Sequence, residues 1–229
     1  MDGAKEPERL GEIIDAAARI FGERGYKRAS VRAIASELGL LQGSLYHYVT
    51  SKEDLLYAVI KRFHDHSWSV LEDGRAVSSS PLAQITAVIK GHVRLCAERQ
   101  VDASVFYGEF RALQPERRAE IMEWRHRYEV ELRTVVDQAK EEGEIPADTD
   151  SHIATLNVLS MINSVFTWYR EEGEASIDEI AETFAKLAVR GLRAKPSQAS
   201  VHDTSQRKSD ESGAARQVNL REHEIAYFG

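Results

Sequence analysis

The sequence predicts an all-α fold made of a small N-terminal head, one connecting helix and a larger helical body. Apolar residues recur at steps of three and four along most of the first 193 residues, which is the spacing of an amphipathic helix. No run of alternating apolar and polar residues bounded by turns marks a sheet. Glycines, prolines and serines that can cap helices stand at the breaks between the periodic segments. With 42% hydrophobic and 29% charged residues, the chain of 229 residues has the composition of an ordinary globular protein.

The head, assigned to residues 1–51, is expected to contain three helices. The first covers residues 8–23 and stops at Gly25. Ser30 can cap a short second helix that ends at Gly39, and a third helix runs from about residue 41 to residue 48. A helix, a glycine turn and another helix in so short a stretch are typical of a helix-turn-helix unit.

The connecting helix is assigned to residues 52–73, and it begins with a capping box in which Ser51 and Asp54 each satisfy a backbone donor of the other. The polar segment EDGRAVSSS, residues 72–80, marks the border with the body, which is assigned to residues 74–194. We expect body helices over residues 81–100, 103–113, 115–143, 150–170 and 176–193. Residues 195–229 are polar and aperiodic, so a disordered tail is expected there.

The charge distribution suits a small DNA-reading head on an acidic body. The net charge is −7, yet residues 1–50 hold seven basic and seven acidic residues, so the whole deficit lies in the remainder. Arg24, Lys27, Arg28 and Arg32 cluster with no acidic residue between Arg24 and Ser36. No apolar run approaches the roughly 18 residues that span a bilayer, and the N-terminus lacks a secretory signal, so we expect a cytoplasmic protein without a membrane partner.

The sequence offers little support for an enzyme, and we expect no catalytic residue, no metal and no cofactor. It contains no glycine-rich phosphate loop, no Gly-x-Ser-x-Gly elbow and no cysteine cluster. His64 and His66 are two residues apart on a helix, so they point to different faces. The single cysteine, Cys96, lies on an apolar helical face and is interpreted as core. The competing classes are a ligand-gated regulator, a ligand-independent DNA-binding dimer, and a helical hydrolase or binding module.

The stretch SVRAIASELGLLQGSLYHYVTSKEDLLYAVI, residues 30–60, resembles the DNA-binding region of the TetR family of regulators, which are similar to the tetracycline repressor. The resemblance extends from about residue 13 to residue 60. It rests on the pattern Val31-Arg32-x-Ile34-Ala35, the glycine turn at Gly39, the pair Leu45-Tyr46, and Ser51-Lys52-Glu53-x-Leu55-Leu56 at the start of the connecting helix. The resemblance implies that the third helix reads the major groove.

A recognition helix keeps small, hydrogen-bonding side chains toward the groove while an apolar side chain, here Leu45, packs on the head. Gln42 can pair with adenine, and Gly43 permits close approach of the backbone. The third helix holds no Lys or Arg, so phosphate contacts must come from its surroundings. The candidate DNA-binding residues are Lys27, Arg28, Ser30, Arg32, Gln42, Gly43, Ser44, Tyr46, His47 and Lys52. Arg32 could instead reach a guanine, and Tyr46 could simply cover the core, as could Tyr48.

For the body, the resemblance implies a ligand pocket within residues 81–170 and a homodimer formed by the last two helices. Candidate ligand-binding residues are the aromatic ones in this region, namely Phe106, Tyr107, Phe110, Trp124, Tyr128, Phe166 and Trp168. Arg111, Arg125 or Arg170 could meet an anionic end of the ligand. Packing in the core is the alternative for each aromatic residue. The dimer face would combine a polar strip that includes Asn157 and Asn163 with an apolar face of the last helix.

The expected function is a ligand-responsive transcriptional regulator, a repressor, in the cytoplasm of a bacterium. It would bind palindromic double-stranded DNA as a homodimer and leave it when an effector binds. The segments VFYGEFRAL, EEGEIPADTD and FTWYREEG resemble the sensor domains of regulators that answer to acyl-CoA thioesters of lipid, steroid or aromatic breakdown. The alternatives are a regulator of an efflux system that answers to a hydrophobic drug, and a DNA-binding dimer without a ligand. The connecting helix is expected to be the only element that joins head and body.

Overall fold

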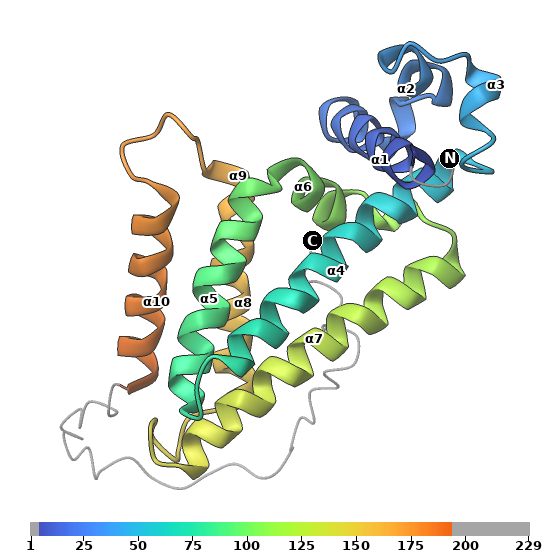
Figure 1. The fold of residues 1–229 in the computed structure, drawn as a ribbon. Coiled ribbons are helices and arrows are strands. Elements are labelled where there is room, and N and C mark those ends of the chain that lie inside the picture. The colour runs from blue at the N-terminus through green and yellow to red at the C-terminus, as the bar shows by residue number, and fades with distance from the viewer. Residues whose placement is uncertain (1–4, 194–229) are drawn as a thin grey trace, which may run out of the picture.

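The computed structural model describes residues 5–193, and the expected tail over residues 195–229 lies outside them. Every regular element of the described residues is a helix, which confirms the predicted fold class (Figure 1). The head contains the helices α1 (Lys5–Arg24), η1 (Tyr26–Arg28), α2 (Val31–Glu37) and α3 (Gln42–Leu45). The connecting helix is α4 (Lys52–Ala76). The body contains α5 (Pro81–Glu98), α6 (Gln100–Gly108), η2 (Phe110–Ala112), α7 (Pro115–Glu141), α8 (Ser151–Asn163), α9 (Val165–Trp168) and α10 (Ile177–Arg193). No described helix is long and apolar enough to cross a membrane.

The helix ends in the head follow the local signals in the sequence. The hydroxyl of Ser30 accepts a hydrogen bond from the backbone N–H of Ala33 at 3.1 Å, which caps α2. Gly25 and Gly39 have φ values of 74° and 65°, in the left-handed region that only glycine adopts without strain. The chain can therefore turn sharply after α1 and between α2 and α3.

The capping box at the start of α4 forms only in half, contrary to the sequence-based expectation. The hydroxyl of Ser51 accepts from the backbone N–H of Asp54 at 3.1 Å. The backbone N–H of Ser51 does not donate to the carboxylate of Asp54, which accepts instead from both the backbone N–H and the hydroxyl of Thr50. Two donors on one residue hold the carboxylate there in place of one donor on Ser51.

Two body segments that were expected to be single helices are divided. The segment 150–170 breaks at Ser164 into α8 and α9, where the hydroxyls of Ser164 and Thr167 donate to the carbonyls of Met161 and Ser164. Such side-chain bonds compete with the helical backbone bonds, which explains the break. The segment 103–113 is also divided into two helices. Helix α6 begins earlier than expected, at Gln100, and ends at Gly108, and the separate helix η2 follows it.

Helix α5 is the centre of the body, since it contacts α4, α7, α8 and α10 (Figure 1). Its residues Ile85, Ile89, Val93 and Cys96 are fully buried, so Cys96 belongs to the core as expected. Helix α10 lies on the opposite side of the body from α7. Burial raises the pKa of the Cys96 thiol to about 12, which keeps it protonated and inert.

Helix α4 continues to Ala76, beyond residue 73 where the connecting helix was expected to end. Gly74, in the segment interpreted as a loop, is buried inside the helix. A Cβ atom on Gly74 would lie 2.5 Å from Cγ2 and 2.9 Å from the backbone nitrogen of Val88. The backbones of α4 and α5 therefore meet at this glycine. The polar residues around Gly74 gave no indication of this contact between helices.

We expect Gly74→Ala to destabilise the protein by about 1–3 kcal/mol, because the added methyl group must displace the backbone of α5. Alanine otherwise favours a helix over glycine by up to about 1 kcal/mol, so the sign of the change reports the close contact. Urea denaturation followed by circular dichroism measures it. Gly11→Ala in α1 is the control, because a Cβ there meets no atom within 4 Å. A stabilised Gly74→Ala protein would contradict the packing of α4 on α5.

Candidate functional site

The residues expected to read bases lie together on the solvent side of the helix-turn-helix unit. Gln42, Gly43 and His47 are exposed, and Tyr46 is 45% exposed, while Leu45 is fully buried and fixes α3 to the head. Helix α3 is a single turn over Gln42–Leu45, and hydrogen-bonded turns continue it to Tyr48. This arrangement is the one that a recognition element needs, with its apolar side fixed and its polar side free.

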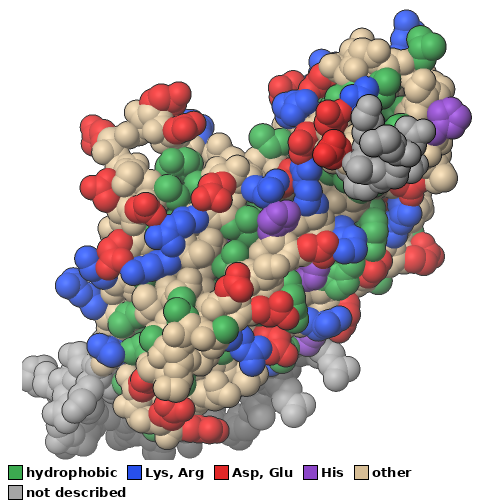
Figure 2. Space-filling view, in the orientation of Figure 1, with side chains coloured by type: hydrophobic (Ala, Val, Ile, Leu, Met, Phe, Trp, Pro, Cys, Tyr) green, Lys and Arg blue, Asp and Glu red, His purple; other side chains and the backbone are tan. Residues whose placement is uncertain are grey.

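The expected phosphate-binding residues surround this element, although their roles stay predictions. Lys27, Arg28 and Arg32 are exposed, as is the cap residue Ser30. Nε of Arg28 donates to the carbonyl of Arg24 at 2.7 Å, which caps the end of α1. On the face shown in Figure 2, charged side chains of both signs are interspersed over the body. Nothing on that face of the body suggests a general nucleic-acid-binding surface, which agrees with a DNA-reading head.

Lys52 has a different position from the one expected for a phosphate-binding residue. Its Nζ donates to the backbone carbonyls of Tyr26 and Ala29 at 2.9 and 3.0 Å and lies 4.1 Å from the centre of the Tyr26 ring. Lys52 thus ties the start of α4 to η1 and to Ala29, the residue that follows η1. A DNA phosphate would compete with these two carbonyls for the ammonium group.

Leu41 is a candidate contact that the sequence analysis missed. Its side chain is 80% exposed, immediately before the exposed residues of α3. An exposed leucine beside a recognition element can contact the methyl group of a thymine. The signal in the sequence was the pair Leu40-Leu41, because Leu40 packs against the core and the chain direction then turns Leu41 outward.

We expect Gly43→Ala to keep or slightly raise the stability of the free protein while it weakens DNA binding. A Cβ on Gly43 meets no atom within 4 Å, so the fold accepts alanine, which favours a helix by up to about 1 kcal/mol. The same methyl group would obstruct a close approach of the backbone to the bases. Thermal denaturation and fluorescence anisotropy on operator DNA measure the two effects. Unchanged DNA affinity would remove the role assigned to Gly43.

Some of the residues expected to bind a ligand line a small, partly open cavity of about 30 Å³ in the body. Only three of the seven aromatic candidates line it, namely Phe106, Tyr107 and Tyr128. The other lining residues are His64 and Ser67 from α4, His92 from α5, Arg125 from α7, and Leu159 and Asn163 from α8.

The remaining four aromatic candidates lie elsewhere. Phe110 is 2% exposed and packs in the core, and the ring of Phe166 stacks on Tyr107 at 5.3 Å. Trp124 lines a separate groove on the surface. Trp168 is 45% exposed, and its ring lies 6.0 Å from that of Phe184. Helical periodicity predicted that these rings face the interior of the body. It could not distinguish a cavity wall from a packed core.

The polar wall of the cavity was not identified from the sequence. Nδ1 of His92 lies 3.2 Å from the hydroxyl of Tyr128. Nε2 of His92 and Oδ1 of Asn163 are buried and have no hydrogen-bond partner among residues 5–193. Burial lowers the pKa of His92 to about 4, although the nearby Asn163 raises it somewhat, so the imidazole is neutral at pH 7. Buried polar atoms are normally satisfied, so Nε2 of His92, on which Asn163 already acts, is a candidate to bind a polar group.

Among the three arginines proposed to meet an anionic ligand, only Arg125 reaches the cavity. Its side chain is buried, its Nη2 donates to the carbonyl of Phe106 at 2.7 Å, and its guanidinium lies 4.0 Å from the centre of the Phe110 ring. Burial lowers its pKa to about 10, so it keeps its charge at neutral pH. Arg111 packs over Phe110, and Arg170 is exposed and donates to the carbonyl of Tyr169.

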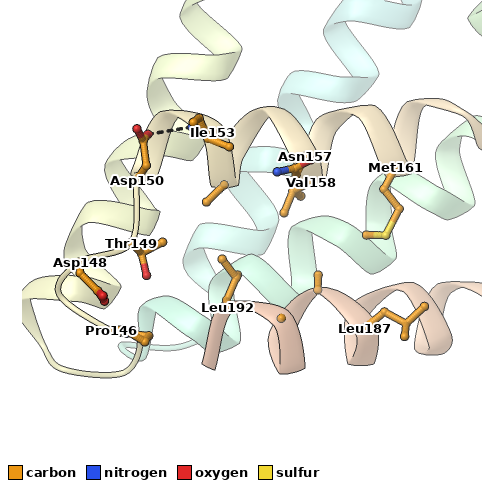
Figure 3. A pocket seen from close by; sticks show the side chains of 13 residues that line it. Pro146, Asp148, Thr149, Asp150, Ile153, Asn157, Val158, Met161, Leu187 and Leu192 are labelled. Atoms are coloured by element: carbon orange, nitrogen blue, oxygen red, sulfur yellow. Dashed lines mark hydrogen bonds between the residues drawn. The ribbon is translucent and has the colours of Figure 1, made fainter. Parts of the chain in front are cut away.

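Helices α8 and α10 border a groove of about 560 Å³ on the surface of the body (Figure 3). Ile153 of α8 and Leu187 of α10 line this groove and are 56% and 57% exposed. Asn157 and Met161 also line it, whereas Asn163, expected in the same polar strip, faces the inner cavity instead. The groove is thus an exposed surface to which both helices contribute apolar side chains.

The rest of helix α10 is fixed to the body. Ala181 and Ala185 are buried, and two ion pairs, Lys90–Glu182 at 2.5 Å and Arg94–Asp178 at 2.7 Å, join α10 to α5. The apolar face of the last helix therefore serves two surfaces, the packed body and the open groove.

The connecting helix was expected from the sequence to be the only link between head and body. The structure shows direct contacts as well. Arg62 of α4 lies between Asp15 of α1 and Asp102 of α6, with N···O distances of 2.6 and 2.7 Å. Helix α6 also packs directly on α1, since a Cβ on Gly22 would lie 3.2 Å from Val101. A displacement of α6 therefore acts on the head without passing along α4.

A second link joins the N-terminal end of α7 to the start of α4. Nη2 of Arg117 lies 2.6 Å from Asp54, and the guanidinium lies 4.8 Å from the centre of the Tyr57 ring. Burial alone would raise the pKa of Asp54, but hydrogen bonds from Thr50, Arg117 and Ser51 lower it from 3.8 to about 2. The carboxylate is thus charged at neutral pH.

The lowered pKa of Asp54 predicts a pH dependence of stability. A carboxylate with a lower pKa in the folded state contributes stability that is fully present above its ordinary pKa. This contribution is lost as the pH falls through about 2, the folded value. We expect Asp54→Asn to lower the denaturation midpoint in urea at pH 6 and to have a smaller effect as the pH approaches 2. A difference independent of pH would contradict the assignment.

Comparison with known proteins decides the family. Residues 78–192 match the family model described as Tetracyclin repressor-like, C-terminal domain, and residues 13–59 match the model described as Bacterial regulatory proteins, tetR family. This chain belongs to the TetR family. Both parts of the molecule, the helix-turn-helix head and the helical body, are thus TetR domains.

Relatives of this TetR protein are transcriptional repressors and regulators. It is 24% identical over 185 residues to the HTH-type transcriptional repressor KstR2 of Mycobacterium tuberculosis (strain ATCC 25618 / H37Rv), covering 80% of this chain and 92% of the relative. It is 27% identical over 192 residues to the fatty acid metabolism regulator protein of Bacillus subtilis (strain 168), covering 83% and 98% of the two chains.

Solved structures of TetR regulators have the same fold. The structure of the ketosteroid transcriptional regulator KstR2 of M. tuberculosis matches with a TM-score of 0.76 at 24% identity, over 82% of this chain and 96% of the other. AibR, solved in complex with isovaleryl coenzyme A and operator DNA, matches with a TM-score of 0.71 at 24% identity, over 81% and 98% of the two chains. This TetR protein is therefore a DNA-binding transcriptional repressor by family, and the family and its relatives are regulators, not enzymes.

Proposed function

We propose that this TetR-family repressor binds an inverted-repeat operator as a homodimer and leaves it when a small molecule enters the cavity of the body. The observation that carries the proposal is that α4 is both a wall of the cavity, through His64 and Ser67, and the helix on which the head is mounted. A ligand that moves this wall also moves the recognition element. Binding and release are then linked because the ligand prefers one arrangement of α4 over the other.

The cavity must expand to accept an effector. Its volume of about 30 Å³ is roughly that of one water molecule. The enclosing helices α4, α5, α6, α7 and α8 must therefore separate when a larger molecule binds. A hundredfold loss of operator affinity requires about 2.7 kcal/mol of coupling, which lies within the range typical of allosteric proteins.

An acyl-CoA thioester of lipid, steroid or aromatic breakdown is the effector that we favour. The similarity to a regulator of fatty acid metabolism supports this class, as does the fold shared with AibR, which was solved with isovaleryl coenzyme A. The aromatic wall of Phe106, Tyr107 and Tyr128 suits an apolar acyl part. A hydrophobic drug sensed by an efflux regulator is the second candidate, because the same wall would accept it. Apart from its effector, the protein needs no cofactor in this scheme, and it acts on DNA in the bacterial cytoplasm.

The dimer is proposed to form through α8 and α10, where the groove lined by Ile153 and Leu187 is open. A second copy related by two-fold symmetry would place its own α8 and α10 against this groove and form a four-helix bundle. The two heads would then meet successive major grooves of an inverted repeat.

A gel-shift titration on DNA upstream of the gene tests the proposal, with a panel of CoA thioesters, their free acids and uncharged aromatic compounds as additions. We expect one retarded complex of two protomers, released by a thioester. Release by an uncharged aromatic compound alone would replace the thioester by the drug-like effector. A complex that no compound releases, with no heat of binding in calorimetry, would favour the ligand-independent dimer.

A further inference from the structure

A surface groove of about 260 Å³ shares one lining residue with the cavity of the body. It is lined by His64, Asp65 and Trp68 of α4 and by Trp124 and Arg127 of α7. His64 lines both the groove and the cavity. The imidazole is therefore the partition between the two spaces, on the seam between α4 and α7.

On the side of the groove, the imidazole of His64 contacts two tryptophan rings. The rings of His64 and Trp124 are nearly parallel, at 15°, with centres 4.6 Å apart, and Trp68 lies 6.0 Å from the imidazole. Burial lowers the pKa of His64, and the cations Lys61 and Arg127 lower it further against the opposing effect of Asp65. A neutral ring held by stacking can rotate aside without breaking an ion pair.

The groove has the chemistry of a site for a flat, anionic group. Trp68 and Trp124 supply two aromatic walls, and the guanidinium of Arg127 lies 5.6 Å from the centre of the Trp68 ring. Asp65, the acidic residue of the lining, is bound by Lys61 at 2.7 Å. A planar heterocycle can stack on the tryptophans while a phosphate or carboxylate pairs with the arginine.

The inner cavity complements this groove. The unpartnered Nε2 of His92 and Oδ1 of Asn163 are both deeply buried polar atoms in its wall. A single oxygen on an otherwise apolar group, a carbonyl or a hydroxyl, can meet His92 there. The two spaces thus differ in the part of a ligand that each would bind.

We propose that the cavity and the groove are the two ends of one binding site for an extended ligand, with His64 as the gate between them. The apolar end, which carries one oxygen toward Nε2 of His92, lies inside, and the flat anionic end stays in the groove against Trp68, Trp124 and Arg127. This inference rests on the proposed effector function and adds the route of entry and the division of the ligand. A ligand that occupies both spaces acts directly on α4, the helix on which the head is mounted.

Tryptophan fluorescence tests the site, because two of the three tryptophans of the chain line the groove. Trp168→Phe removes the third, so the emission of this variant reports the groove alone. The probes are decanoyl-CoA, decanoate and CoA, and calorimetry measures their affinities in parallel. We expect decanoyl-CoA to change the emission and decanoate to bind without that change.

Arg127→Gln separates the two ends of the ligand. We expect it to weaken decanoyl-CoA by about five- to tenfold and to leave decanoate unchanged, because only the thioester carries phosphates. Arg118→Gln is the matched control, since Arg118 is an exposed residue of the same helix that does not line the groove. His64→Ala should speed the association of decanoyl-CoA in stopped-flow measurements, while His64→Phe, which keeps a flat ring, should not.

In one outcome, decanoyl-CoA releases DNA while the tryptophan emission does not change and Arg127→Gln binds it as tightly as the unmodified protein does. This result would overturn the two-part site and leave the proposed function standing. Equal weakening of decanoyl-CoA and decanoate by Arg127→Gln would overturn the division of the ligand. Absence of binding and of DNA release for all the thioesters and aromatic compounds would overturn the proposed function together with this inference.

Discussion

Replacing Leu187 by glutamate is expected to convert the dimer into monomers and to lower affinity for an inverted-repeat operator by about a hundredfold or more. Leu187 lines the groove between α8 and α10 and is 57% exposed in the single chain (Figure 3). If a second copy covers the groove, the new carboxylate must be buried without a partner at the centre of the interface. Two independent heads also lose the gain in affinity that comes from joined half-sites.

Sedimentation velocity gives the oligomeric state, and fluorescence anisotropy on a labelled operator gives the affinity. Val77→Glu is the matched control, because Val77 is 61% exposed at the end of α4 and does not line the groove. The control should remain dimeric and bind as the unmodified protein does. A Leu187→Glu protein that sediments as a dimer would show that α8 and α10 do not form the interface.

The sequence was sufficient for the head because its helix ends depend on local chemistry. Ser30 and Ser51 cap α2 and α4 through their own hydroxyl groups, and Gly25 and Gly39 adopt positive φ values. Each of these signals acts over three or four residues, so it can be recognised without knowledge of the tertiary fold. The buried Leu45 could likewise be assigned from its place in the apolar pattern.

The contacts between distant segments could not be predicted in the same way. Gly74 appeared in a polar run, and only its contact with Val88 shows that the helix continues through it. Asn163 lies on a helix assigned to the dimer face, yet it lines the cavity and interacts with His92. Periodicity gives the face of a helix but not the neighbour that this face meets.

The aromatic residues of the body show the same limit. Tyr107 and Phe166 stack on each other, but only Tyr107 lines the cavity. Large apolar side chains at helical spacing are equally suited to a packed core and to a cavity wall, and the difference depends on how the helices cross. The polar atoms that make the cavity a candidate site belong to His92 and Asn163. Neither residue was among the ligand-binding candidates, which were chosen because they are aromatic.

The Arg62 network provides the second large effect that we expect. Asp102 is 6% exposed at its side chain and Arg62 19%, so Arg62→Met would leave a buried carboxylate without its principal cation. Removal of one partner from a buried ion pair costs about 3–5 kcal/mol. We expect this loss in urea denaturation followed by circular dichroism. A loss below about 1 kcal/mol would show that the Arg62–Asp102 pair is not a buried contact in solution.

The head end of the same network can be broken without this loss of stability. Asp15 is 54% exposed at its side chain, so Asp15→Asn should change the stability by no more than about 1 kcal/mol. It nevertheless removes the charge that ties α1 to Arg62 and, through Asp102, to α6. If α6 transmits ligand binding to the head by this route, the thioester that releases the unmodified protein should release Asp15→Asn less effectively, by about five- to tenfold in the ratio of operator affinities.

Glu12→Gln is the control for this coupling, because Glu12 lies on the same helix, has the same 54% exposure and, among residues 5–193, pairs only with Arg9 of α1. It should respond to the thioester as the unmodified protein does. The ratio of operator affinities with and without the thioester is measured by anisotropy for all three proteins. An unchanged ratio in Asp15→Asn would show that the signal passes along α4 alone, and that the contact of α1 with α6 only supports the head.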